Sequence, residues 1–184
     1  MKKIFTLIVV SLMAAMTCQA EELQVSGIDY VNAGQRIDLD TCDVYIVPVV
    51  YAEKKNNHQA AKQQAAFDEL GKTILSQLKG TYRKASYKVI DDVKEAPAGA
   101  TIIEACLKEI DWGSGALRQV VGFGAGSISG RYNIKVSNAS GLVVELENRR
   151  IHDTTFSSAK GAAVIKVYNK AMANDLIEVL RKIK

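Results

Sequence analysis

The sequence predicts a two-layer α/β (α+β) domain, in which a mixed sheet of about five strands carries two main helices packed on one face. Three observations indicate this architecture: short apolar runs typical of strands, two long amphipathic helical patterns, and an order of strand, helix, several strands and a closing helix. Of the 184 residues, 48% are hydrophobic and 24% are charged, which is the balance of one globular domain. This composition excludes a disordered chain, a collagen and a disulfide-dense miniprotein.

Residues 1–20 are predicted to be an export signal. Lys2 and Lys3 precede a short apolar run, and a small-residue end, Cys18-Gln19-Ala20, follows it. Cleavage after Ala20 leaves 22 basic and 20 acidic residues, a net charge of +2. A charge this small does not indicate a nucleic-acid partner, because nucleic-acid-binding proteins usually carry a concentrated basic stripe. The predicted location is therefore periplasmic or secreted.

The alternative is a lipoprotein anchored to the membrane through Cys18, because lipoprotein signals are cut immediately before a cysteine. Thr17 stands where such signals place Gly, Ala or Ser, and Ala15 stands where they place Leu, so ordinary cleavage is favoured. A transmembrane helix needs about 20 apolar residues, more than this run offers, and no such segment is expected in the mature chain.

Residues 21–43 have a mixed polar pattern and are expected to form an N-terminal leader with at most one short strand. A single α/β domain is predicted over residues 44–184. Its first strand, Val44–Tyr51, is apolar on both faces, and Pro48 is expected to end it, to bulge or to lie exposed. A helix of about 20 residues follows, from Asn56 or Asn57 to a stop at Gly80; Gly71 inside it suggests close approach to the sheet.

Further strands are expected over 82–90 and 102–112, separated by a polar loop, and the first strand, helix and second strand should form a right-handed crossover. Strict alternation over 128–136 predicts a strand with one buried and one wet face. Turn residues 137–141 and a resumed apolar pattern at 142–146 make this the clearest hairpin in the chain. The closing helix is predicted over Ala162–Ile183.

A glycine-rich segment is the most unusual feature, since six of the 13 glycines fall between Gly113 and Gly130. A phosphate-binding loop requires a Lys followed by Ser or Thr, which is missing, and a dinucleotide fingerprint requires a following helix where a strand is predicted. A bent or bulged strand entrance remains the simplest interpretation. The candidate binding residues of this segment are Trp112, Arg118, Gly122, Phe123, Gly124 and Gly126.

The Gly-Phe-Gly-Ala-Gly sequence at 122–126, ahead of the alternating strand, the hairpin and the C-terminal helix, resembles a bacterial envelope family, domain of unknown function family 4410. The resemblance runs from about Val44 to the C-terminus. It implies an exported protein or lipoprotein without an assigned activity. The first strand and helix are also similar to small α/β domains of envelope accessory proteins, a likeness of fold that implies no function.

No catalytic residue, metal ligand or cofactor is predicted. His58 and His152 are the only histidines, and no paired spacing typical of zinc ligands occurs. Cys42 and Cys106 can form one disulfide outside the cytoplasm or remain two free thiols.

Two functional hypotheses follow. The first is a non-enzymatic accessory module that binds an envelope protein through a sheet edge or the glycine-rich segment. The second is a small-ligand-binding or enzymatic domain with a site around residues 111–126. An exposed apolar patch or an open strand edge favours the first hypothesis, and a focused pocket with perturbed titratable groups favours the second.

Overall fold

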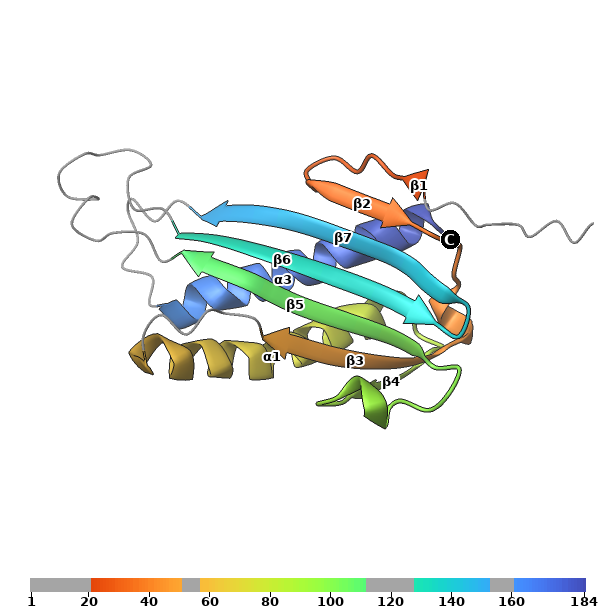
Figure 1. The fold of residues 1–184 in the computed structure, drawn as a ribbon, viewed down its shortest axis with the longest axis horizontal. Helices are drawn as coiled ribbons and strands as arrows, with labels where there is room; N and C mark the ends of the chain where they lie inside the picture. Colours follow the sequence, from red (N-terminus) through yellow and green to blue (C-terminus); the bar gives the residue numbers. More distant parts are fainter. Residues whose placement is uncertain (1–20, 51–56, 112–127, 153–160) are drawn as a thin grey trace, which may run out of the picture.

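The computed structural model describes residues 21–50, 57–111, 128–152 and 161–184. Within these residues seven strands form one mixed sheet, and two long helices pack on one of its faces (Figure 1). The predicted α+β class and the one-sided helical layer are confirmed. The sheet is larger than the five strands expected, because the short strands β1 and β2 are added at one margin, beside β7.

The strands are β1 (Glu21–Glu22), β2 (Tyr30–Ala33), β3 (Asp43–Val50), β4 (Ser86–Val89), β5 (Thr101–Asp111), β6 (Ile128–Asn138) and β7 (Gly141–His152). The helices are α1 (Asn57–Thr81) and α3 (Gly161–Lys182), with 3-10 turns η1 (Leu39–Thr41) and η2 (Val93–Glu95). Across the sheet the order is β1-β2-β7-β6-β5-β3-β4. Strand β3 pairs in parallel with β4 and β5, and the other pairings are antiparallel.

Strand β3 continues through Pro48, which pairs with Ala105 of β5. On its other side β3 pairs with β4 only as far as Ile46, so Pro48 lies beyond the end of that ladder. A proline has no backbone N–H to donate to a neighbouring strand. Because β4 ends before it reaches Pro48, no hydrogen bond to β4 is required at this position.

Helix α1 matches the predicted helix, beginning at Asn57 and passing Gly80 by one residue. A Cβ added at Gly71 would lie 2.8 Å from Cγ1 of Val89 and 3.4 Å from Cγ of Pro48. The predicted close approach of the helix to the sheet at Gly71 is therefore confirmed.

The hairpin is also confirmed, with β6 and β7 paired along their whole lengths from Ile128↔His152 to Asn138↔Gly141. Its turn uses Gly141 at φ +111°, a region that favours glycine, and a hydrogen bond of 2.8 Å from the Ser140 N–H to Oδ1 of Asn138.

Residues 21–43 are more ordered than a leader with one short strand. Strand β2 pairs with β7, β1 pairs with β2, and Val31 and Leu39 are both 1% exposed. The segment therefore contributes to the core. Its strands are short because only a few residues reach β7, which is why no long apolar alternation marks them in the sequence.

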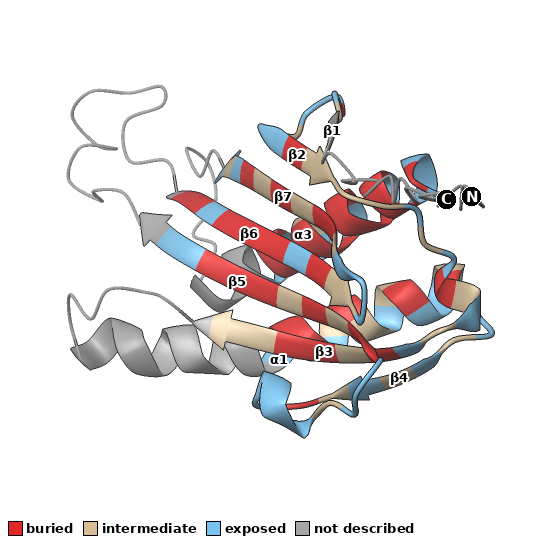
Figure 2. Ribbon diagram, turned by 45° about the vertical axis from the view of Figure 1, so that its right-hand side comes forward, coloured by how far each residue is buried: buried red, intermediate tan, exposed pale blue. Residues whose placement is uncertain are grey.

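The core lies between the sheet and the helices, where Figure 2 shows the buried residues. Along β6, Tyr132, Ile134 and Val136 are fully buried on the helix side, whereas Arg131 and Lys135 on the other side are exposed. The buried set faces α3, whose own apolar stripe is Tyr168, Met172, Leu176, Val179 and Ile183. Among the described residues, no helix is long and apolar enough to cross a membrane.

Candidate functional site

The six candidate residues of the glycine-rich segment, Trp112, Arg118, Gly122, Phe123, Gly124 and Gly126, lie outside the described residues. The structure does describe both cysteines that the sequence left open. Cys42 and Cys106 are free thiols, the first half-buried and the second buried. Cys106 pairs with Val49 of β3, and Val49 lies seven residues beyond Cys42. At the rise of a strand, these seven residues span about 23 Å, so Cys42 and Cys106 are far beyond the reach of a disulfide.

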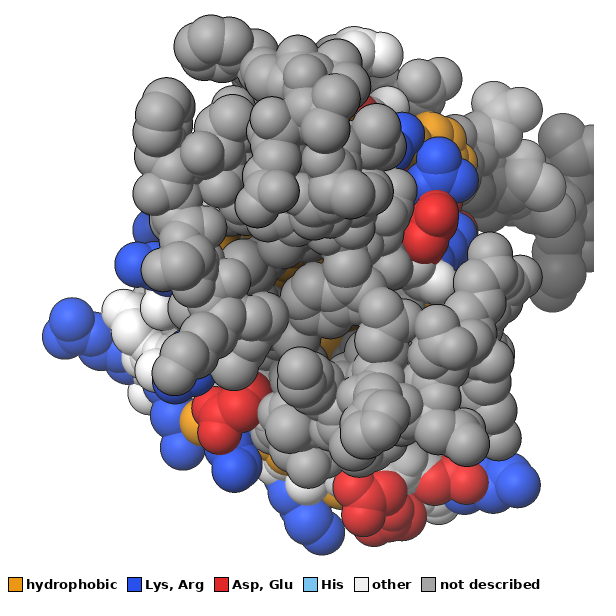
Figure 3. All heavy atoms as spheres, turned by 90° about the vertical axis from the view of Figure 1, so that its left-hand side faces the viewer, with side chains coloured by type: hydrophobic (Ala, Val, Ile, Leu, Met, Phe, Trp, Pro, Cys, Tyr) orange, Lys and Arg blue, Asp and Glu red, His pale blue; other side chains and the backbone are white. Residues whose placement is uncertain are grey.

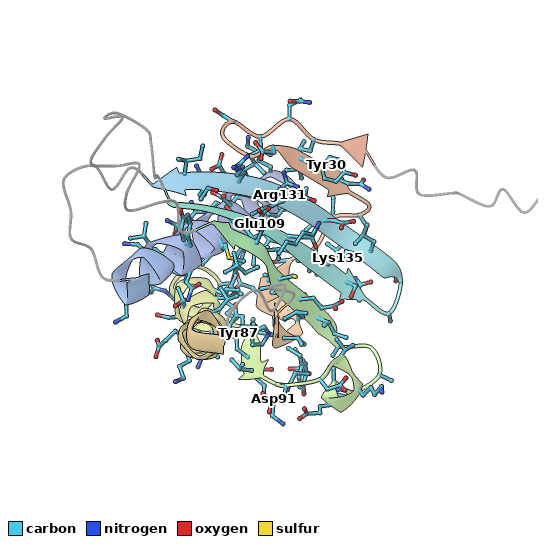
Figure 4. All side chains as sticks on the ribbon, turned by 60° about the vertical axis from the view of Figure 1, so that its left-hand side comes forward. Tyr30, Tyr87, Asp91, Glu109, Arg131 and Lys135 are labelled. Atoms are coloured by element: carbon cyan, nitrogen blue, oxygen red, sulfur yellow. The ribbon has the colours of Figure 1, made fainter. Side chains whose placement is uncertain are left out.

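The helices leave the opposite side of the central strands open, and this side carries a lattice of charges. We call it the open face; its members are Glu104, Lys108, Glu109, Arg131, Asn133, Lys135, Glu145, Glu147 and Arg149. In Figure 4, the labelled Glu109, Arg131 and Lys135 lie on these strands, with Tyr30 of β2 beside them.

Five charges of the open face are paired with one another across strands. Lys108 Nζ lies 2.8 Å from Oε2 of Glu147, and Arg131 Nε lies 3.9 Å from Oε1 of the same carboxylate. Glu145 lies 3.5 Å from Lys135 Nζ and accepts a 2.9 Å hydrogen bond from the Asn133 amide. The face therefore presents a polar surface whose side chains already hold one another in place.

A bulge in β5 helps to build this surface. Leu107 pairs with Tyr132 and Glu109 with Arg131, so Lys108 is the additional residue on β5. Bulges re-aim side chains, and here the extra residue lets Lys108 reach Glu147 two strands away while Glu109 stays beside Arg131.

A second polar cluster lies on the helix side of the same two strands. The Asp175 carboxylate of α3, 4% exposed, accepts hydrogen bonds from the Tyr132 hydroxyl, from Asn148 Nδ2 at 2.7 Å and from Arg150 Nη2 at 2.5 Å. Asn148 Nδ2 also donates to the carbonyl of Gly27 at 2.8 Å. This buried cluster ties α3, the hairpin and the N-terminal segment to one point.

Burial, followed by the hydrogen bond to Asp175, raises the pKa of Tyr132 above its ordinary value. For Arg150, burial lowers the pKa, but the hydrogen bonds to Asp175 and Tyr132 more than offset it and the pKa is raised. Both raised pKa values mean that Tyr132 and Arg150 keep the protons that they donate to the Asp175 carboxylate. Because three donors occupy the carboxylate and the cluster is enclosed, its role is structural.

A hollow of about 330 Å³ opens at the start of β3 and β5, lined by Thr41, Cys42, Asp43, Pro97, Ala98, Gly99, Ala100 and Thr101. It lies at the end of β5 remote from Asp111, where the ligand-binding hypothesis places its site. In the described part of the chain, no group of three or more His, Cys, Asp or Glu side chains gathers as metal ligands would.

Sequence reasoning missed both polar networks. The buried cluster had one signal: Asp175 interrupts the apolar stripe of the closing helix, next to Leu176. A lone carboxylate on a buried helical face demands partners. The partners could not be named, because they come from a hairpin and a loop that only the tertiary structure brings beneath α3.

The chain belongs to the family described as Domain of unknown function (DUF4410), whose model matches residues 17–163. The resemblance inferred from the sequence is confirmed, although the match begins earlier than Val44 and ends at the start of α3. No curated protein matches the chain.

Among solved structures, the fold is similar to that of a PelC dodecamer from Paraburkholderia phytofirmans. The single-substitution form of that protein has 12% sequence identity and a TM-score of 0.54, covering 82% of this chain and 97% of that chain. A second PelC dodecamer structure gives 9% identity and a TM-score of 0.53, covering 82% and 95%. A neuraminyllactose-binding hemagglutinin homolog from Helicobacter pylori has 13% identity and a TM-score of 0.43, covering 82% and 87%. At these identities the likeness is one of fold.

Proposed function

We propose that this chain is an exported bacterial envelope protein that binds protein, a second copy of itself included, and has no enzymatic activity of its own. The observation that carries the proposal is the open face. It extends over β5, β6 and β7, and Lys108, Arg131, Lys135, Glu145 and Glu147 are already joined in ion pairs before any partner arrives. Preorganised polar side chains lower the entropic cost of association, and mixed charge sets the register between partners.

Two features favour a partner that binds the face of the sheet over a partner that adds a strand at its margin. Strand β4, at one margin, has four residues and includes the exposed Lys88; β1, at the other, has two residues. Short margins and lysines are the means by which proteins prevent strand addition. The face of the sheet is therefore the better candidate than its edges.

A second copy is included because PelC, which shares the fold, is a dodecamer. An interface between copies can be isologous, or it can be heterologous and close into a ring. The open face suits either arrangement, because it carries both signs of charge and can meet a complementary charge pattern.

Truncating the open face tests this proposal. Replacing Arg131 and Lys135 together by Ala should weaken self-association, measured by sedimentation equilibrium, by about thirtyfold or more, as expected for hot-spot residues worth about 2 kcal/mol. The matched control replaces the exposed Lys88 and Lys94 by Ala and should leave association unchanged. A wild-type chain that stays monomeric, and that crosslinks to no protein in its native envelope, would refute the proposal.

Export is tested separately, by the intact mass of the protein isolated from its native envelope. Cleavage after Ala20 gives a chain that begins at Glu21, the first residue of β1. A diacylglyceryl product beginning at Cys18 would replace the periplasmic or secreted form by the lipoprotein.

A further inference from the structure

We infer that the outer side of the helical layer is a docking surface for an anionic phospholipid bilayer. Helices α1 and α3 lie side by side behind the sheet (Figure 1), and their exposed side chains are overwhelmingly basic. We call this surface the basic helical face. Its exposed charged side chains, among the described residues, are the basic Lys72, Lys79, Arg83, Lys166, Lys170, Arg181 and Lys182 and the acidic Glu69 and Glu178.

Few of these cations are neutralised. Lys72 lies 3.9 Å from Glu69, and Lys182 lies 3.8 Å from Glu178, both exposed pairs within one helix. The other five basic residues of the face make no ion pair with a described residue. The open face differs, since three of its cations, Lys108, Arg131 and Lys135, are paired with carboxylates. Figure 3 shows the mixture of basic and acidic side chains around the end of the molecule.

Stabilisation of helix ends explains only part of the excess. Basic residues near a helix C-terminus interact favourably with the helix dipole, and Lys79, Arg181 and Lys182 lie in last turns. Lys72, Lys166 and Lys170 lie outside the first and last turns of their helices, so the helix dipole does not account for them. They form the part of the basic excess that an external anion can stabilise, although Lys72 also lies near Glu69.

The surface that these residues form fits a bilayer. Both helices run in the same direction, opposite to β3 and β7, and a helix the length of α3 extends about 33 Å. Their cationic stripes point away from the sheet, so they can approach a flat plane of phosphate groups together. Exposed Val167, between Lys166 and Lys170, adds an apolar side chain on this face. The described helices lie on such a surface rather than cross it.

A second copy of this chain is the rival occupant, but its described residues offer no extended acidic face. Asp38 and Asp92 cap 3-10 turns, and Glu95 accepts from the backbone N–H of Asp92. The carboxylates Glu145 and Glu147 of the open face have cations of their own. A phospholipid surface has no such competing partners.

Vesicle binding tests the inference on the chain from Glu21 onward, which contains every described residue. It should bind vesicles of phosphatidylglycerol and phosphatidylcholine in equal parts at low salt, release at high salt, and ignore pure phosphatidylcholine. Each cation near an anionic surface contributes about fivefold in affinity. Replacing Lys72, Lys166 and Lys170 by Gln should therefore reduce vesicle affinity by at least about tenfold.

The matched control replaces Arg36, Lys88 and Lys94 by Gln, which changes net charge equally at exposed or loop positions outside the helical layer. It should lose less than about threefold, and both variants should keep the wild-type melting midpoint. Equal losses in the two variants, or no preference for phosphatidylglycerol, would overturn the inference. So would salt-dependent self-association that only the helical variant loses, because a second copy would then occupy the face.

This inference goes beyond the proposed function and can fail independently of it. The Arg131 and Lys135 double variant should bind vesicles like the wild type, and the helical triple variant should associate like the wild type. If both results hold, one side of the protein faces lipid and the other remains available to protein.

Discussion

Strands β6 and β7 carry polar side chains on both sides, in two contrasting environments. On the helix side, Tyr132, Asn148 and Arg150 converge on Asp175, which is 4% exposed. On the open side, Glu147 holds its cations in water, with its side chain 30% exposed. Alternate residues of the same two strands therefore build an enclosed cluster and a solvated lattice.

Hydrogen-bond distance alone does not determine how much an ion pair contributes to stability. The pair of Lys108 and Glu147 at 2.8 Å is almost as short as the pair of Arg150 and Asp175 at 2.5 Å. Exposed pairs contribute about 0 to 1 kcal/mol, because water replaces either partner, whereas a buried carboxylate without its donors has no replacement. The buried cluster should govern stability, and the open lattice should govern recognition.

The largest effect is expected from Asp175→Ala. It leaves three buried or half-buried donors without their acceptor and should lower the free energy of unfolding by about 3 to 5 kcal/mol. Urea denaturation followed by circular dichroism measures this loss. A loss below about 1 kcal/mol would mean that the buried cluster behaves like the open lattice.

Leu176→Ala measures how much a buried apolar side chain on the same face of α3 contributes to the free energy of unfolding. The side chain is fully buried, so truncation should reduce the free energy of unfolding by about 2 to 5 kcal/mol. Val167→Ala is the matched control on the same helix, because Val167 is 49% exposed and should lose less than about 0.5 kcal/mol. Equal effects would show that the closing helix is not packed into the core.

Tyr132→Phe removes one donor and keeps the ring, and should cost about 1 to 2 kcal/mol at neutral pH. Because the pKa of Tyr132 is raised, the folded state holds this proton where the unfolded state, with an ordinary pKa of 10, releases it. The stability linked to this group is thus present below pH 10 and is lost as the pH rises. The gap between wild type and Tyr132→Phe should narrow above pH 10.

Alkaline titration followed by tyrosine absorbance and denaturation checks this dependence. Tyr87→Phe serves as the control, because burial also raises the pKa of Tyr87, to about 12, at a position remote from Asp175. A constant gap between wild type and Tyr132→Phe at all pH values would contradict the assignment of the shift to the buried cluster.

The smallest effect is expected from Glu147→Gln on the open face. It breaks exposed pairs with Lys108 and Arg131 and should change the free energy of unfolding by less than about 1 kcal/mol. The same variant should weaken self-association in sedimentation equilibrium. A large loss of stability without a loss of association would reverse the roles assigned to the two faces.

Local patterns carried much of the fold. Alternation from Ile128 to Val136, followed by Asn138 to Gly141, was sufficient to predict the hairpin, because strand periodicity and turn chemistry act over a few residues. The stripe from Tyr168 to Ile183 predicted α3 for the same reason. The sequence allowed one short strand within residues 21–43, whereas the structure has two, β1 and β2, whose two and four residues are too few to form a pattern.

The site was less predictable than the fold. The candidates of the glycine-rich segment were chosen for backbone freedom, and they lie outside the described residues. The open face was visible as the polar half of an alternation, but the pairing of Lys108 with Glu147 depends on a bulge and on the order of β5, β6 and β7. Strand order is a long-range property that no local spacing encodes.

The α+β class, the two helices, the hairpin and the family could be inferred from the sequence alone, because all of them follow from short-range periodicity or from a contiguous motif. The three-dimensional fold was needed to show that residues 21–33 close one margin of the sheet and that Asp175 meets Tyr132 and Asn148. It alone placed the basic stripes of α1 and α3 side by side. These arrangements join residues distant in the chain, so their energies come from burial and from charges brought together by folding.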